Sequence, residues 1–453
     1  MKLTRMTARR GGLAAAVFLP AALALSACGP VSPHNIVSPT PQGSQLATPH
    51  AAEPSAAAAS ASSVPAPASS SASASGAPAP APAPAPTVAP KDGAVQTAKG
   101  LAWADGSPVQ ATTRALPAGN GSGSLLHSTV RELETDTSEE LTPKAITKDG
   151  VALGADGKGL WVLGAKGETA AVSGYPEKGT TPDVPVADGA GFAWVDEATQ
   201  GGKKVDRVLR AAGPGAKAQV LATLPSVKSE DGYGWSVVSA FTDGSGTRQL
   251  LVASPQRTGS AGAGTPEYDY YTVPSAGGQL TLVGKDLSAA WGTPKGFFAK
   301  RYASDGLEEF GALTEQGFRT IMRSTDPDVG GLPDSTDGTS AVLLYTSIPG
   351  DTADTGSVAM VLDLDSHEGT ALDLRLQRGD ENAWYADAAN GELIVATQRT
   401  IYVATPRGVT PMAAVSKDVA PGVAMSVWRE GELLGFTNLD ITRGWSGVYR
   451  LAK

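Results

Sequence analysis

The sequence predicts an all-β protein and, within that class, a β-propeller. Three observations support this prediction: a turn dipeptide recurs at a spacing near 40 residues, short β-branched and aromatic runs follow it, and no segment keeps a helical period over several turns. We expect seven four-stranded blades, with six or eight as alternatives, and a pair of β-sandwiches as the competing architecture.

The first element along the chain is an export signal in residues 1–27. A basic start without acidic residues precedes an apolar run from Gly11 to Ala27, which is shorter than a membrane span of about 20 residues. This arrangement is typical of a secretory signal peptide. The basic residues are Lys2, Arg5, Arg9 and Arg10.

The signal ends in Leu25-Ser26-Ala27-Cys28, which resembles the lipobox of bacterial prolipoproteins. The resemblance implies diacylation of the Cys28 thiol and cleavage before it, which anchors the chain to the membrane through the diacylglyceryl group, since two acyl chains suffice for stable attachment. Cys28 is the only cysteine, so an intramolecular disulfide framework is excluded. The alternative is an ordinary secretion signal that contains a cysteine.

Residues 28–90 combine Cys28 with a tether. The 62 residues from Gly29 to Pro90 include 14 Pro and one charged residue, Glu53. Proline removes backbone donors and biases its neighbours toward extended geometry, so neither a helix nor a central strand is expected here. We predict a disordered, semi-rigid spacer that would reach roughly 190 Å if extended throughout at ~3.1 Å per residue.

Residues 91–453 carry the propeller domain. Its recurring dipeptide is a polar residue followed by Gly, which favours tight hairpin turns because a type I′ turn needs positive φ at both central positions. The glycines lie 39, 43, 64, 42, 53 and 40 residues apart. The dipeptides are Asp149-Gly150, Asp188-Gly189, Asp231-Gly232, Lys295-Gly296, Asp337-Gly338, Asn390-Gly391 and Glu430-Gly431.

The clearest copy of the unit spans Trp384–Val415 and predicts one complete blade. Its expected strands are Trp384–Ala389, Glu392–Thr397, Ile401–Thr405 and Val409–Val415.

The last copy, from Val423, has only three strands, so a closed ring needs one strand from the start of the domain. Val109–Leu116 and Thr129–Glu134 are the two candidates for this strand. Thr129–Leu141 is also the best helix candidate, because Thr129 and Glu132 could form a capping box.

The repeated unit resembles the repeat of TolB-like bacterial β-propellers. It consists of a turn, an apolar strand, a polar turn and a second strand such as Ile401-Tyr402-Val403. The resemblance covers Asp149–Lys453 as an architecture, and several copies lack the Ser-Pro that usually precedes Asp-Gly in that family. It implies the fold and leaves the function open.

Charge and composition exclude several functions. Removal of residues 1–27 changes the formal net charge from −9 to −13, so neither nucleic acid nor direct adsorption to anionic lipid is favoured. His127 and His367 are the only histidines outside the tether, and neither a nucleophile elbow nor a phosphate-binding loop occurs. We therefore predict no catalytic residue and no cofactor.

One acidic cluster is a candidate calcium site. Ca²⁺ takes six to eight oxygen ligands, and two loops expected on one propeller face carry five aspartates, although their spacing differs from the EF-hand pattern. The alternative is a solvated acidic loop. The five residues are Asp326, Asp328, Asp334, Asp351 and Asp354.

The sequence thus predicts an exported, lipid-anchored and monomeric protein on the outer face of the cell membrane. We expect a non-catalytic binding or scaffolding module for an envelope protein or glycan. The alternative is a glycosidase- or lyase-like propeller enzyme with carboxylates about 5 to 9 Å apart at the central channel.

Overall fold

The computed structural model describes residues 92–451 except 120, 133–143, 157, 165–166, 178–179, 227–233, 259–265, 328–330, 350–357, 374–383, 398–399, 415–423 and 440–442. Every regular element in this part of the chain is a β-strand. Within the same ranges, no helix has the length and hydropathy needed to cross a membrane. The predicted signal peptide and the tether with Cys28 lie outside the described residues.

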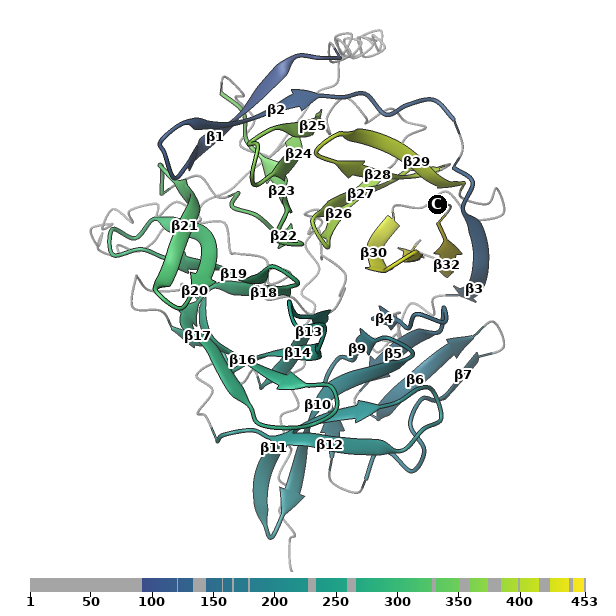
Figure 1. Ribbon diagram of the computed structural model, residues 1–453. Coiled ribbons are helices and arrows are strands. Elements are labelled where there is room, and N and C mark those ends of the chain that lie inside the picture. Colours follow the sequence, from purple (N-terminus) through teal and green to yellow (C-terminus); the bar gives the residue numbers. More distant parts are fainter. Residues whose placement is uncertain are drawn as a thin grey trace, which may run out of the picture.

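The strands form antiparallel sheets that stand radially around one axis (Figure 1), and we number these blades in chain order. Each innermost strand contacts the innermost strand of the next blade, and the last contacts the first. This closed ring confirms the predicted β-propeller. The innermost strands in the described chain are β4 (Ala145–Ile146), β9 (Val186–Asp188), β13 (Ser236–Thr242), β18 (Ala289–Thr293), β22 (Ser335–Thr336), β26 (Trp384–Ala389) and β30 (Ala424–Glu430).

The first three blades continue outward by antiparallel pairing. The first adds β5 (Ala152–Asp156), β6 (Gly159–Gly164) and β7 (Gly167–Ala170). The second adds β10 (Gly191–Gln200), which also pairs with β8 (Thr181–Pro182), then β11 (Lys203–Ala211) and β12 (Ala218–Thr223). The third adds β14 (Arg248–Ala253), then β16 (Pro266–Pro274), which pairs with both β15 (Arg257–Thr258) and β17 (Thr281–Leu287).

The fourth to sixth blades each have four strands in sequential order. The fourth adds β19 (Gly296–Tyr302), β20 (Glu308–Thr314) and β21 (Gly317–Ser324). The fifth adds β23 (Ser340–Thr346), β24 (Val358–Asp363) and β25 (Gly369–Asp373). The sixth adds β27 (Glu392–Thr397), β28 (Thr400–Thr405) and β29 (Gly408–Ala414), which agrees with the four predicted strands to within one residue at each boundary.

The seventh blade closes the ring with a strand from the start of the domain. It adds β31 (Leu433–Leu439) and β32 (Arg443–Arg450), and β32 then pairs with β3 (Ser124–Glu132). The second candidate for the closing strand is therefore confirmed over residues 129–132. The helix expectation from Thr129 is wrong at those residues, because a capping box cannot compete with a nine-residue strand that completes an open sheet edge.

The first candidate closing strand has a different role. It lies in β2 (Pro108–Thr113), which forms a hairpin with β1 (Val95–Trp103); we call this hairpin the strap. In the strap, β1 pairs with β21 of the fourth blade and β2 pairs in parallel with β25 of the fifth. The strap thus joins the outer edges of two neighbouring blades into one ten-stranded sheet.

After the strap, the chain follows the circumference to the seventh blade (Figure 1). The main-chain N–H of Arg114 donates to Ala371 O (2.8 Å), and that of Gly123 donates to Met412 O (2.8 Å) before β3 begins. Residues 92–132 therefore cover the rim from the fourth to the seventh blade, and we call this segment the wrap.

The hydrophobic core lies between the blades. Seven buried clusters occur among the described residues, and each cluster is shared by two neighbouring blades. Between the fourth and fifth blades, the strap contributes Leu101, Trp103 and Val109 to the cluster. Trp103, Trp194 and Trp235 are almost completely buried, so these large side chains fill space between neighbouring blades.

Six of the seven predicted dipeptides join the innermost strand of a blade to the second strand. Asn390 and Gly391 show the expected geometry most fully, with φ of 51° and 71°. The exception is Asp231-Gly232, which lies outside the described residues and precedes β13, the innermost strand of the third blade. The corresponding turn follows β13, where Asp243 Oδ1 accepts the main-chain N–H groups of Ser245 and Thr247.

Candidate functional site

The innermost strands leave a small pocket at the centre of the ring, with a volume of about 70 Å³. Its lining comes from the first, second, third, sixth and seventh blades, so no single blade forms it. Asn390 stands in the turn after β26, and Arg429 and Glu430 end β30. The other lining residues are Ala145, Ile146, Val186, Ala187, Ser239 and Ala240.

Asp188 is the common partner of the charged groups that lie beside the pocket. Its carboxylate is buried and accepts hydrogen bonds from Arg210 Nε at Oδ2 and from Arg248 Nε at Oδ1, the latter at 2.8 Å. Arg248 Nη2 also lies 3.7 Å from Glu430 Oε1. One carboxylate at the end of β9 therefore ties the second blade to the third, and Arg248 extends the link to the seventh.

These contacts separate the pKa values of the two carboxyl groups. Burial raises the pKa of Asp188, but the hydrogen bonds and charges of Arg210 and Arg248 outweigh it and hold the pKa below its ordinary value of 3.8. Burial raises the pKa of Glu430 above its ordinary value, against the opposing charge of Arg248. Asp188 is thus a fixed anion, and Glu430 is the more readily protonated of the two.

Arg429 places a second guanidinium at the pocket wall. Its Nε donates to Gly431 O (3.0 Å), and its Nη1 forms an ion pair with Glu392 on β27 of the sixth blade. Burial lowers the pKa of Arg429 from its ordinary value. The pocket therefore combines a guanidinium, a carboxyl, an amide and the Ser239 hydroxyl, a set that can bind a polar ligand group by donating and accepting hydrogen bonds.

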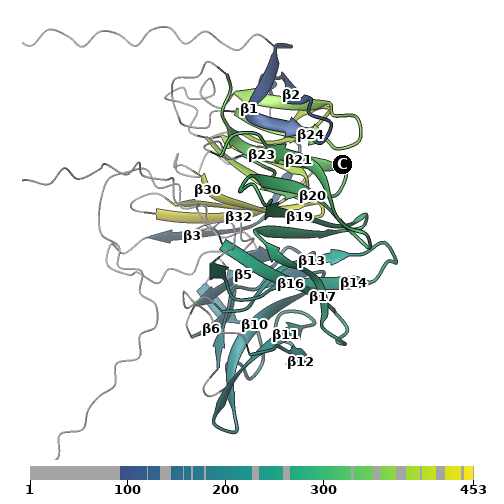
Figure 2. The ribbon, with the colours of Figure 1, turned by 90° about the vertical axis from the view of Figure 1, so that its left-hand side faces the viewer.

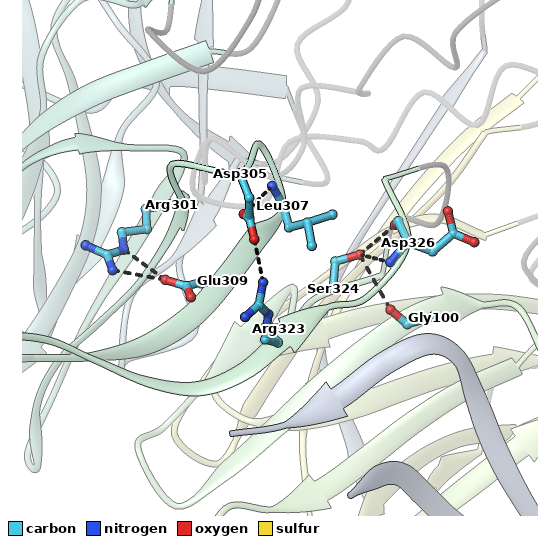
Figure 3. Close-up of polar contacts among 8 residues, drawn as sticks. All are labelled: Gly100, Arg301, Asp305, Leu307, Glu309, Arg323, Ser324 and Asp326. Atoms are coloured by element: carbon cyan, nitrogen blue, oxygen red, sulfur yellow. Dashed lines mark hydrogen bonds and ion pairs between the residues drawn. The ribbon is translucent and has the colours of Figure 1, made fainter. Parts of the chain in front are cut away.

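The proposed calcium ligands fall partly outside the structure. Asp328, Asp351 and Asp354 lie outside the described residues. Ser324 Oγ donates to the main-chain oxygen of Asp326 (2.7 Å), whose carboxylate points away from Ser324 and Gly100 (Figure 3). Asp334 Oδ2 accepts the main-chain N–H of Leu344 (2.8 Å), and burial raises the pKa of Asp334.

Calcium binding therefore stays a prediction. In the part of the chain that the structure describes, no group of three or more His, Cys, Asp or Glu is placed to hold a metal ion.

His367 packs against a tryptophan of the strap. The ring of His367 stacks on that of Trp103, with centroids 3.8 Å apart and an interplanar angle of 3°. His367 belongs to the turn between β24 and β25, where Asp363 Oδ1 accepts the main-chain N–H groups of Asp365 and Ser366. His127 lies on β3.

Sequence reasoning missed the arginine network because it treated Asp188 and Glu430 only as turn residues. The side chain of Asp188 is joined to Arg248, which is 60 positions away. The spacing of the dipeptides could have indicated this network. Each dipeptide joins the first strand of a blade to the second, so the polar residues of all the dipeptides must lie at the same end of the ring.

No protein-family model and no curated relative matches the sequence. Among solved structures, the chain is similar to a prolyl endopeptidase at 15% identity and a TM-score of 0.38, covering 58% of this chain and 40% of that one. It is similar to BamB from Moraxella catarrhalis at 11% identity and a TM-score of 0.35, with 80% and 99% covered.

A putative TolB from Agrobacterium tumefaciens is similar at 14% identity and a TM-score of 0.32, with 74% of this chain and 100% of that chain covered. The propeller assignment itself depends on the radial blades and their closure.

Proposed function

We propose that this protein is a lipid-anchored, extracytoplasmic β-propeller that acts as a non-catalytic binding or scaffolding module. The ligand would be an envelope protein or glycan. The proposed anchor is Cys28, supported by the preceding Leu25-Ser26-Ala27 and by the basic and apolar segment before it. The Ala/Pro/Ser-rich tether supplies the reach between the membrane and the ring.

The observation that favours binding is the state of the charges at the central pocket. A glycosidase needs two carboxyl groups that both face the substrate, whereas Asp188 directs both carboxylate oxygens to arginines. The ion pairs of Asp188 lie beside the pocket, and its lining offers the guanidinium of Arg429 and the amide of Asn390, which suit recognition of a polar ligand group. The proposed role follows from this combination.

The alternative, a propeller enzyme, retains one supporting observation. Glu430 lines the pocket and has a raised pKa, as a general acid requires. Glu430→Gln separates the two functions. A binding module degrades no envelope component with either side chain at this position, while an enzyme loses turnover by a factor of about 10² to 10⁴ in the variant.

The test uses the full-length protein in its own envelope. Metabolic labelling with an alkyne palmitate should mark the wild-type chain and leave Cys28→Ala unmarked and released from the membrane. Affinity capture from detergent-solubilised envelopes should recover a saturable partner with the wild type and at least tenfold less with Arg429→Gln. Arg257→Gln, at an ion pair in the third blade away from the pocket, is the matched control. Failure of the wild type to retain any envelope component would refute the proposed function.

A further inference from the structure

The outer edges of the blades differ in what covers them. The strap occupies the edges of the fourth and fifth blades through β21 and β25. Among the described residues, β12 is the last strand of the second sheet and β17 the last of the third, beside β16. These two neighbouring edges, which we call the open rim, lie on the part of the circumference away from the strap (Figures 1 and 2).

The open rim is partly apolar, and its charged residues are confined to the end of β17. β12 contains no charged residue, and in β17 the charged residues are Lys285 and Asp286, of which Asp286 forms an ion pair with Arg257. Charged residues make up 18% of the chain. Val220 on β12 is 46% exposed and Leu282 on β17 is 44% exposed, and these are two of the four exposed large apolar residues in the described chain. Leu221 and Leu280 share one core cluster, so the two edges are adjacent.

The backbone of β12 offers a hydrogen-bonding edge. The N–H of Leu224 donates inward to Asp206 O at 2.8 Å. Since N–H groups alternate in direction along a strand, Thr223 directs its N–H away from β11. Edge strands are usually protected by charge, proline or great shortness, and Ala218–Thr223 has neither charge nor proline.

The strap shows what kind of segment such an edge accepts. A register shift interrupts β12 next to Leu221, and β21 has the same irregularity next to Ile321. Directly past that irregularity, β21 pairs with the strap at Met322–Ser324. The strap buries Leu101, Trp103 and Val109 against the fourth and fifth blades while its backbone continues their sheets.

We propose that the open rim binds an extended, uncharged and apolar segment of a partner protein by strand addition. This inference rests on the proposed binding function and assigns it a surface separate from the central pocket. A second copy of this chain is a poorer occupant, because the strap is already paired within its own ring and the formal net charge of −13 without residues 1–27 makes copies repel.

The test places a photo-crosslinking residue, p-benzoylphenylalanine, at Val220 of the full-length protein in membranes. The same residue at Val95, which is 63% exposed on the strap, is the position control. We expect a heteromeric product at Val220 only, joined to a partner segment that is extended and uncharged.

Backbone dependence distinguishes strand addition from side-chain contact. In the Val220 cross-linking protein, Thr223→Pro removes the outward donor and should lower the yield at least tenfold. Thr223→Val keeps the donor and should leave the yield within twofold, with both melting temperatures measured by circular dichroism. Should the proline variant melt early, Val220→Asp is tested as a competitor of the wild type, and competition equal to that of the wild type would show that no apolar segment contacts this edge.

Three results would overturn the inference: equal yields for Thr223→Pro and Thr223→Val, a product with the mass of two copies, or no product at Val220. If capture by the wild type persists and depends on Arg429 in any of these cases, the proposed function stands and only the open rim is excluded. If the wild type captures nothing, the proposed function itself fails.

Discussion

Asp188 shows how one side chain can hold three blades. Asp188 is the first residue of the turn dipeptide in the second blade. Its two carboxylate oxygens accept hydrogen bonds from arginines of the second and third blades, and one of these, Arg248, also lies close to Glu430 of the seventh. A buried carboxylate with two cationic partners costs desolvation energy and recovers it only with good geometry. The arrangement links two innermost strands, β9 and β30, through β14 of the third blade.

Asp188→Ala should therefore lower the free energy of unfolding by about 3 kcal/mol, because it leaves two partly buried guanidinium groups without their anion. Urea denaturation followed by tryptophan fluorescence measures the change. Asp149→Ala, which removes an exposed ion pair with Lys148, is the control and should change the value by less than about 0.5 kcal/mol. Equal effects of the two variants would contradict the assigned role.

The same network predicts a pH dependence. The folded-state pKa of Asp188 lies below its ordinary value of 3.8, so the carboxylate contributes stability that is complete above the unfolded pKa and is lost as pH falls through the folded pKa. The difference in unfolding free energy between wild type and Asp188→Asn should thus be constant from about pH 5 to about pH 7. It should shrink below about pH 4. A difference that grows on acidification would refute the prediction.

At the scale of elements, local turns and distant pairings were predictable to different degrees. The strands of the sixth blade follow from alternation and from Asn390-Gly391, because each strand pairs with its neighbour in sequence. The strap was not predictable in this way, since its partners lie more than 200 residues away and one of its ladders is parallel. Asp231-Gly232 misled because a second Asp-Gly dipeptide, Asp243-Gly244, lies 12 residues further on and supplies the turn of this blade.

The turn geometry gives a test of one element. Gly391 has φ of 71°, and a Cβ there would lie 2.9 Å from the main-chain nitrogen of Asp337. Gly391→Ala should destabilise the fold by more than about 1 kcal/mol, since strain and crowding add. Gly234→Ala is the control, because Gly234 has open space around its Cα. Thermal unfolding of the two variants measures the difference, and equal midpoints would contradict it.

The strap gives a second test at this scale. Trp103 is 2% exposed and covered by His367, so Trp103→Ala should cost about 3–5 kcal/mol through lost burial and a cavity. Val95→Ala, on the exposed start of the same strand, should cost far less. Hydrogen exchange should rise in β21 and β25 of the Trp103 variant, and unchanged protection there would show that the strap does not hold these edges.

For the whole molecule, the ring depends on both ends of the domain. β3 from the beginning completes the blade that contains the last three strands, so one sheet joins the two ends of the domain and closes the ring. The sequence indicated this because the final copy lacks one strand. The central pocket was beyond sequence reasoning, since its lining comes from five blades whose side-chain directions depend on the closed ring.

A truncation series tests this dependence on closure. A chain that starts at residue 91 should unfold cooperatively with the wild-type midpoint, because only the tether and signal are removed. A chain that starts at residue 133 lacks the wrap and should lose cooperative unfolding and elute as an aggregate in size-exclusion chromatography. A compact, cooperative product of the shorter chain would show that the ring closes without β3.

The wrap also decides where a pulling force would enter the ring. Gly93 donates its N–H to Thr113 O, and Thr113 pairs with Ala371 on the outer strand of the fifth blade. A tether that begins at this point is fastened to the circumference and not to the axis. A force applied through the residues before Gly93 would therefore reach the ring at the outer strand of the fifth blade and would load the sheet edges before the innermost strands.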